Sequence, residues 1–449
     1  MRGILLGRSL LVCASLGLSS GPAAADTYFV GPGGRDCDAG TARRPWSTLQ
    51  HAADRVGPGD TVIVLPGTYA GFNLVTSGSE GRPIRFSARR GAVIDRAASG
   101  EHRSRINLDG VSHVVIEGFE IVGTSDQSES KEGIRVIGPG DGSAGHITIR
   151  RNHVHHNGDR NILTGFVSNL TIEHNVAHHA HQEHGIYVSN SADDHVIRGN
   201  LVYGNAASGI QVNADASLGG DGVITGVLIE DNLVHDNGAG GGWVNLGKGP
   251  VRARGGGSAI NLDGVQRSIV RGNLLLDNHA SGISLYRIDG GQPSHGNLVT
   301  HNIIVNARDG RWALNIQDGS SGNTVRNNLL FSRHPLNGAI RIDARSLVNL
   351  ASDDNIVEDG FAIDDRVIDL ASWRRRTGDD HRSITPGLPG FLSRFRDRSG
   401  PRARRVWPAT STRAGVRCRD RRRESLAAAR APLTAEVSCR AVARLGTCC

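Results

Sequence analysis

The stretch IRGNLVYGNAASGIQVN, residues 197–213, contains the pattern that decides the fold. It holds two short strand patterns, IRGNLV around Asn200 and GIQV from Gly209, and these two patterns alternate along the chain. Tight spacings between successive asparagines are 23 to 26 residues, and longer spacings contain glycine-rich insertions. The asparagines that share this frame are Asn152, Asn175, Asn200, Asn232, Asn273, Asn302 and Asn328.

A repeat of this length predicts a solenoid wound from short strands. Each strand alternates aliphatic residues, which point inward, with polar residues, which point outward. A single coil cannot bury its interior, so the core forms only when coils stack. We therefore predict an all-β fold, a right-handed parallel β-helix. Stacked asparagines can hydrogen-bond along the stack and satisfy the turn backbone, so we assign them a structural role.

The segment WSTLQHAADRVGPGD, residues 46–60, breaks the strand pattern. Ser47 or Thr48 can cap a helix whose apolar positions fall on one face, and Gly57 can end it. We expect a short helix here that covers the N-terminal end of the stack.

The first residues have the pattern of a secretory signal peptide. Arg2 and Arg8 accompany an apolar stretch at residues 10–18, which is too short to span a membrane, and small residues follow at 23–25. We expect a signal peptide over residues 1–25 and a secreted protein, extracellular or periplasmic, without a membrane partner.

The β-helix domain is expected over residues 26–390. Strand alternation then stops, and residues 391–449 form an arginine-rich tail that we interpret as disordered or as an out-of-frame translation. The net charge of +7 comes from this tail, which contributes +11 from residue 394 onward and leaves −4 for the rest. The body therefore lacks the basic surface that nucleic-acid binding needs.

Three motifs near the N-terminus resemble a known family. They are YFVGPGGRDCDAGT at 28–41, PWSTLQHAADRVGPGDTVIVLPGTY at 45–69 and GRPIRFSA at 81–88. They resemble secreted β-helix proteins related to family 9 pectate lyases, and the later coils resemble the broad right-handed β-helix repeat family. The resemblance implies a carbohydrate-active protein. For family 9 it implies a lysine base beside aspartate-bound calcium, and the lysines of this chain are Lys131 and Lys248.

Aligning the GIQV-like strands gives two outward columns of polar residues. A long polar face suits a chain of sugars, because adjacent coils are spaced at about 4.8 Å. We expect substrate-binding residues among Gln211, Asn213, Asn261 and Asp263. Asp263 also has a structural interpretation, because its hexapeptide INLDGV occurs a second time at 106–111.

The segment HHAHQEHGIYV, residues 178–188, places His184 and Tyr187 at one coil. A histidine and a tyrosine form a workable base and acid near neutral pH. The segment SLYRIDGG adds Tyr286 and Arg287 on the same side, and Arg287 can neutralise a carboxylate. These residues are the predicted catalytic group, and Asp289 is a predicted binding residue. Zinc bound by the histidines of 178–184 and of the preceding coil is an alternative whose spacing matches no ligand motif.

No cofactor is certain from the sequence. Asp215 and Asp221 lie in one loop and are candidate calcium ligands, since carboxylates and loop carbonyls bind calcium. The longest insertion, residues 238–258, contains Lys248, Arg252 and Arg254 and no acid. We expect these residues, here called the cationic lip, to contact an acidic polysaccharide.

The predicted function is cleavage of an extracellular uronic-acid polysaccharide by β-elimination, in a monomeric protein. A C5-epimerase shares the first step of that reaction. A glycoside hydrolase using paired carboxylates is a second alternative, with Asp215 and either Asp263 or Asp289 as the pair. A non-catalytic carbohydrate-binding or envelope protein is a third, because the stack alone suffices for it.

Overall fold

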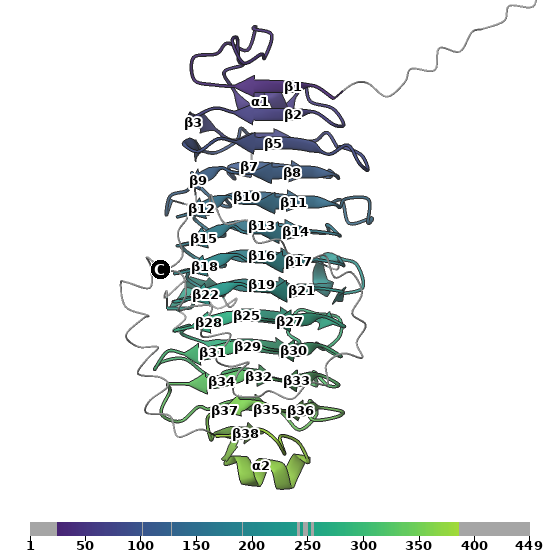
Figure 1. Ribbon diagram of the computed structural model, residues 1–449, viewed down its shortest axis with the longest axis vertical. Coiled ribbons are helices and arrows are strands. Elements are labelled where there is room, and N and C mark those ends of the chain that lie inside the picture. The colour runs from purple at the N-terminus through teal and green to yellow at the C-terminus, as the bar shows by residue number, and fades with distance from the viewer. Residues whose placement is uncertain are drawn as a thin grey trace, which may run out of the picture.

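The computed structural model describes residues 25–385 except residues 101, 127, 191, 240–242, 246–249 and 253–255. The predicted signal peptide, apart from its last residue, and the predicted tail at 391–449 lie outside the described residues. As predicted, the described chain forms a right-handed parallel β-helix, and its coils are built from three sheets (Figure 1). Each coil passes through sheet 1, sheet 2 and sheet 3 in that order.

Three sheets run along the stack. Sheet 1 contains β1 (Thr27–Val30), β2 (Thr61–Val64), β5 (Ile84–Ala88), β8 (Val114–Glu117), β11 (Ile147–Arg150), β14 (Thr171–Glu173), β17 (Val196–Arg198), β21 (Leu228–Glu230), β27 (Ile269–Arg271), β30 (Leu298–Thr300), β33 (Thr324–Arg326) and β36 (Ala351–Asp353). Sheet 2 contains β3 (Gly67–Ala70), β6 (Ala92–Arg96), β9 (Glu120–Val122), β12 (His153–His155), β15 (Val176–His178), β18 (Leu201–Tyr203), β22 (Leu233–His235), β28 (Leu274–Leu276), β31 (Ile303–Asn306), β34 (Leu329–Ser332) and β37 (Ile356–Val357). Sheet 3 contains β4 (Phe72–Leu74), β7 (Ile106–Asp109), β10 (Ile134–Ile137), β13 (Ile162–Gly165), β16 (Ile186–Ser189), β19 (Ile210–Asn213), β25 (Ser258–Asp263), β29 (Ser281–Tyr286), β32 (Leu314–Ile316), β35 (Ile340–Ile342), β38 (Phe361–Ile363) and β39 (Arg366–Ile368).

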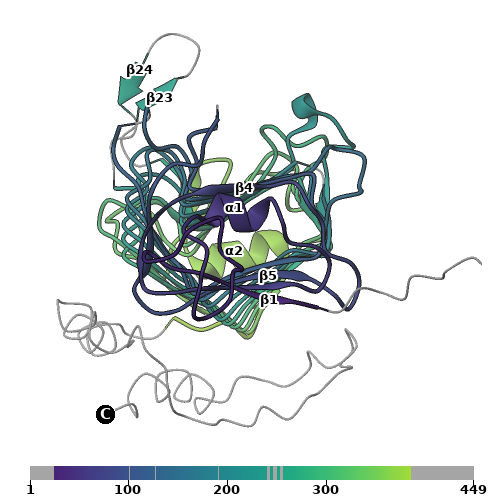
Figure 2. The same ribbon diagram turned by 90° about the horizontal axis from the view of Figure 1, so that it is seen from above.

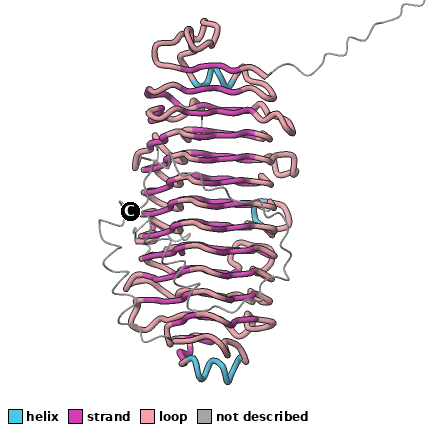
Figure 3. The backbone as a smooth tube through the Cα atoms, viewed as in Figure 1, coloured by secondary structure: helices cyan, strands magenta, loops and turns pink. Residues whose placement is uncertain are grey.

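Short elements in the insertions complete the fold. The pair β20 (Ile224–Thr225) and β26 (Val265–Gln266) is parallel, and the pair β23 (Trp243–Asn245) and β24 (Pro250–Arg252) is antiparallel. A 3-10 turn, η1 (Ala216–Leu218), follows β19. Helices occur mainly at the two ends of the stack, whose body consists of strands and turns (Figure 3).

The core follows from the alternation within each strand. In β16 and β19 the aliphatic side chains Ile186, Val188, Ile210 and Val212 are at most 1% exposed and belong to one continuous cluster. The cluster runs from the first coils to the last, because the strands of successive coils pair in parallel, up to β38, which pairs with β39 in antiparallel fashion. Burial of such side chains on every coil is the main stabilising contribution.

The recurring asparagines form a buried ladder, as predicted. The side-chain oxygen of Asn200 accepts the main-chain N–H of Asn175 at 2.9 Å and its side-chain amide at 3.1 Å. The amide of Asn200 in turn donates to Ile172 O at 2.9 Å and to Asn232 Oδ1 at 3.0 Å. The same contacts repeat from Asn152 onward, so these asparagines satisfy the turn between sheets 1 and 2.

The predicted N-terminal helix is present as α1 (Leu49–Ala53). Thr48 is its N-cap and accepts the N–H of His51, and Leu49, Ala52 and Ala53 are buried against the core. The helix ends at Ala53, earlier than the predicted end at Gly57, because the next N–H groups bond back to Ala52 in a tightened turn.

A second helix, α2 (Leu370–Thr377), covers the other end of the stack and was not predicted (Figure 1). Asp380 follows it and is completely buried. Its carboxylate accepts hydrogen bonds from Trp373 Nε1 at 2.9 Å and from Asn355 Nδ2 at 3.1 Å. Asp380 therefore ends the asparagine ladder where a further coil would have supplied another asparagine.

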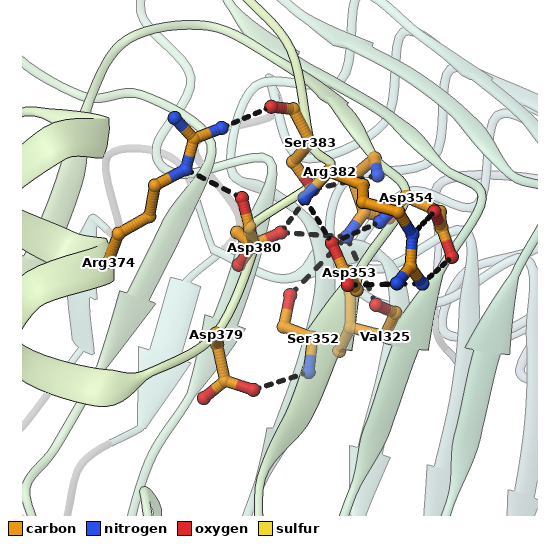
Figure 4. Close-up of polar contacts among 10 residues, drawn as sticks. Val325, Ser352, Asp353, Asp354, Arg374, Asp379, Asp380, Arg382 and Ser383 are labelled. Atoms are coloured by element: carbon orange, nitrogen blue, oxygen red, sulfur yellow. Dashed lines mark hydrogen bonds and ion pairs between the residues drawn. The ribbon is translucent and has the colours of Figure 1, made fainter.

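Arginines hold the same segment against the last coil (Figure 4). Arg374 donates through Nε to the carbonyl oxygen of Asp380 at 2.8 Å, and Arg382 pairs with both Asp353 and Asp354. Within the described ranges, neither α-helix is long and apolar enough to cross a membrane.

Candidate functional site on the outer face of sheet 3

The predicted polar columns lie on the outer face of sheet 3. Tyr187, Gln211, Asn261 and Ser284 are directly opposite one another on β16, β19, β25 and β29. The second column is Ser189, Asn213, Asp263 and Tyr286 in the same register. Figure 2 shows β23 and β24 projecting on one side of the stack and the loop with η1 on the other. The chain order explains this placement. The insertion with β23 and β24 precedes β25 of sheet 3, whereas the loop with η1 follows β19 of sheet 3.

Tyr187 and Asp289 meet at one amide. Asn213 Nδ2 donates to the Tyr187 hydroxyl oxygen at 3.1 Å and to Asp289 Oδ2 at 3.1 Å. The phenol oxygen and the carboxylate oxygen are therefore no farther apart than twice that distance. Asn213 is 5% exposed, whereas Tyr187 is half-buried and Asp289 is exposed. The arrangement presents a phenol and a carboxylate to solvent side by side.

A second amide network lies beside the first. Asn261 Nδ2 donates to Gln211 Oε1 at 2.7 Å and also contacts the hydroxyl of Tyr286. Ser208 Oγ donates to the same Gln211 oxygen at 3.1 Å. Gln211 and Asn261 are both buried, at 6% and 7% exposure, so their amides are oriented before any ligand binds.

Asp263 has a structural role in this site. It is 1% exposed, and its carboxylate accepts the main-chain N–H groups of Ile288, Asp289 and Gly290 at 3.0 to 3.1 Å. Burial raises the pKa of Asp263, and the three N–H donors act in the opposite direction. The predicted substrate contact is therefore corrected, because this side chain positions the loop that carries Asp289 and has almost no exposed surface.

His184 lies beside Tyr187, as predicted. Their ring centroids are 5.0 Å apart in an edge-to-face arrangement. His184 Nδ1 accepts the main-chain N–H of Ser208 at 3.1 Å, so in a neutral ring the hydrogen is on Nε2. This tautomer makes His184 a donor, and the geometry therefore does not favour it as the catalytic base.

Sequence reasoning missed Arg160. Its guanidinium lies 5.3 Å from the centroid of the Tyr187 ring and pairs with Glu183 at 2.6 Å and Glu132 at 3.3 Å. Arg160 stands two residues before Ile162, the first residue of β13, one coil before Tyr187. The repeat in the sequence gives the position of Arg160 within its coil. Its two acidic partners, however, come from the coils before and after it.

Burial determines the protonation of these groups. It raises the pKa of Tyr187 and of Tyr286 above their ordinary values. Burial, together with the positive charge of Arg160, lowers the pKa of His184 to about 3. Near neutral pH both phenols are protonated and the imidazole is neutral, so the site offers hydrogen-bond donors and phenolic protons.

The predicted calcium ligands Asp215 and Asp221 each accept hydrogen bonds within their own turn. Asp215 Oδ1 accepts from the N–H and the hydroxyl of Ser217, and Asp221 Oδ1 accepts the N–H of Val223 at 2.9 Å. Among the described residues, the compact group of potential metal ligands contains neither aspartate and lies on sheet 2. Arg287 is exposed in the segment after β29 and forms no ion pair with a described residue.

The cationic lip lies largely outside the residues that the structure describes. Lys248 and Arg254 lie outside the described residues, and Arg252 is described only as the last residue of β24. Their predicted contact with an acidic polymer stays a prediction. Lys131 is described and lies in the turn before β10, where its N–H donates to Arg103 O.

One curated protein and two solved structures are similar to this chain. The chain is 32% identical over 135 residues to the uncharacterized protein YwoF of Bacillus subtilis (strain 168), which covers 29% of this chain and 28% of that relative's length. The pectate lyase Pel9A structure has 18% identity, a TM-score of 0.49, and coverage of 75% of this chain and 80% of its own. An alginate lyase from Paenibacillus sp. str. FPU-7 has 16% identity, a TM-score of 0.49, and coverage of 70% and 97%.

A family model agrees with the motifs near the N-terminus. The model is described as Pel9A-like, right handed beta helix region, and it matches residues 28–185. The matched range contains α1 and the first coils and ends one residue after His184, before Tyr187 and the rest of the site. Over these coils the chain resembles the Pel9A-like right-handed β-helix proteins, as the N-terminal motifs predicted.

Proposed function

We propose that this protein is a secreted polysaccharide lyase that binds an acidic, uronic-acid-containing polymer along the outer face of sheet 3. The observation that carries the proposal is the shared amide of Asn213, which holds the Tyr187 phenol and the Asp289 carboxylate next to each other. A protonated phenol beside a carboxylate supplies the acid and the base that β-elimination needs.

The reaction assigns one step to each group. Asp289 takes the proton from the carbon next to the substrate carboxyl group, and the electron pair forms a carbon–carbon double bond as the bond to the neighbouring sugar breaks. The leaving oxygen takes the phenolic proton of Tyr187. Arg287 neutralises the substrate carboxylate while negative charge develops on it. Asn213 keeps the two reacting groups in place.

Neighbouring side chains support this arrangement. Arg160 packs over the Tyr187 ring, and Asp263 fixes the loop of Asp289. The oriented amides of Gln211 and Asn261 extend the polar surface along the stack, where hydroxyl groups of a sugar chain can bind.

A glycoside hydrolase is the second candidate. The N–H of Ala216 donates to the main-chain oxygen of Asp289 at 3.0 Å, so the loop of Asp215 lies directly against that of Asp289. Two carboxylates from adjacent loops could act as the general acid and as the base or nucleophile of a glycoside hydrolase. The lyase is favoured because Asp215 Oδ1 is occupied by Ser217, whereas Tyr187 retains its proton.

Incubation with a panel of acidic and neutral polysaccharides tests the proposal. A lyase produces both new reducing ends and the ultraviolet absorbance of an unsaturated uronate, and a hydrolase produces reducing ends alone. An epimerase changes the sugar composition, seen by NMR, without cleavage. Binding without any of these changes would identify a carbohydrate-binding protein and overturn the proposed reaction.

A further inference from the structure

Histidines gather on the outer face of sheet 2, away from the polar columns of sheet 3. Glu120 of β9, His153 and His155 of β12, and His178 of β15 form what is here called the histidine patch. His153 is directly opposite Glu120 on one side, and His155 is directly opposite His178 on the other. Three consecutive coils therefore supply the patch.

The ligand-type atoms of the patch converge. One potential ligand atom each from Glu120, His153 and His155 lies within 4.8 Å of the others. Glu120 Oε1 and His155 Nε2 are 3.6 Å apart, and His153 Nε2 and His178 Nε2 are 2.8 Å apart. Two ligand atoms on one tetrahedral zinc ion are roughly 3.3 Å apart, given bonds of about 2.0 Å. The Glu120–His155 separation of 3.6 Å is near that value, whereas the shorter His153–His178 contact is a hydrogen bond between the two ring nitrogens.

One atom of the patch lacks a hydrogen bond. His155 Nε2 is buried, and it forms no hydrogen bond with any residue that the structure describes. A buried ring nitrogen without a partner is costly, and a metal ion would satisfy it. The distance from His155 Nε2 to Glu120 Oε1 is 3.6 Å. This distance is too long for a hydrogen bond, and it suits two atoms that coordinate the same metal ion.

Ring stacking holds these imidazoles in position. The rings of His155 and His178 are parallel within 1° at 4.9 Å, and Tyr203 of β18 continues the column at 4.6 Å from His178. The column arises because equivalent positions of successive coils repeat at the strand spacing. The ligands are therefore oriented by the solenoid before an ion arrives.

We propose that Glu120, His153 and His155 bind a divalent transition-metal ion of the zinc type, with His178 adjacent as a further nitrogen ligand. Imidazole with one carboxylate is a ligand set that suits zinc and its neighbours rather than calcium, which takes oxygen ligands. The ion would connect β9 to β12 and so clamp neighbouring coils. This site is on another face and does not depend on the proposed function.

Zinc chloride titrated into metal-free protein by calorimetry tests the site. The wild type is expected to bind about one zinc per chain, and Glu120→Gln and His155→Gln each to weaken binding at least about tenfold. Zinc should raise the thermal midpoint of the wild type and not of these variants. Cobalt(II) should give the visible bands of a tetrahedral complex with the wild type only.

The matched control is His146→Asn. His146 stacks on His113 with centroids 4.6 Å apart, so it is a comparable histidine pair outside the patch. Asparagine tolerates the left-handed backbone of His146, whose φ is 58°. Circular dichroism of the metal-free variants checks their fold. Zinc binding that is absent, unchanged in Glu120→Gln and His155→Gln, or equally reduced by the control would overturn the proposal.

Discussion

The buried carboxylate of Asp263 accepts the main-chain N–H of Asp289 at 3.0 Å. The two acids thus have different roles in one site, since Asp263 is 1% exposed and Asp289 is exposed. The buried acid shapes the loop, and the exposed acid is available to a ligand.

Replacing each acid should separate these roles. Asp263→Ala leaves three main-chain N–H groups without their acceptor, at a cost of about 1–3 kcal/mol for each one that finds no other partner. It should lower both the free energy of unfolding and kcat. Asp289→Asn should lower kcat alone. Urea unfolding and initial rates measure the two effects, and an unchanged kcat in Asp263→Ala would contradict the positioning role.

Tyr187→Phe removes the phenolic proton and keeps the ring under Arg160. We expect kcat to fall by about two to four orders of magnitude, which is the usual contribution of a general acid. Tyr203→Phe is the control, because Tyr203 is on sheet 2 in the stack between His178 and His235. Equal rates for Tyr187→Phe and the wild type would remove Tyr187 from the reaction.

Asn200→Ala tests the ladder. Asn200 is 1% exposed and makes four hydrogen bonds within it, so its removal leaves several buried groups unsatisfied. We expect the free energy of unfolding to fall by about 3 kcal/mol or more. Asn337→Ala, which removes one bond of 3.4 Å at a half-buried position, should change it by less than about 0.5 kcal/mol. Similar losses in both variants would show that the ladder has no special role.

His195 gives the stability a pH dependence. Burial lowers its pKa to about 4 from an ordinary 6.5, so the unfolded chain takes up this proton at a higher pH than the folded chain. The stabilisation is complete above pH 6.5 and is lost as the pH falls toward 4, which amounts to about 2 kcal/mol near pH 5. Urea unfolding at about pH 7 and pH 5, with a metal chelator present, should show a smaller difference for His195→Gln. An identical difference in the variant and the wild type would count against this assignment.

The cationic lip is expected to strengthen the binding of an acidic polysaccharide. If the substrate is a polyanion, the combined change Lys248→Gln, Arg252→Gln and Arg254→Gln should raise KM, and added salt should weaken binding by the wild type more than by the variant. Arg287→Gln should instead lower kcat, because the charge of Arg287 is needed while negative charge develops on the substrate carboxylate. A KM that responds to neither the salt nor the lip would indicate a neutral polymer and favour the hydrolase.

The sequence by itself determined the coil. The alternation in strands such as GIQV and the asparagine at each turn are local signals, so they predicted the stacking of parallel coils, the two polar columns and the ladder through Asn200. The division of each coil among three sheets came from the structure. The helix α1 was also readable, because Thr48 and the apolar positions after it lie within a few residues.

Only the tertiary structure decided which polar residues act together. Asn213 and Asp289 are 76 positions apart, and their contact depends on the lengths of the loops between them. Arg160 reaches Tyr187 across a coil, and Asp263 points into the loop of the next coil. A period in the sequence places residues in columns, but the partner of each side chain depends on where turns and insertions bring other coils, and that is a property of the stacked molecule.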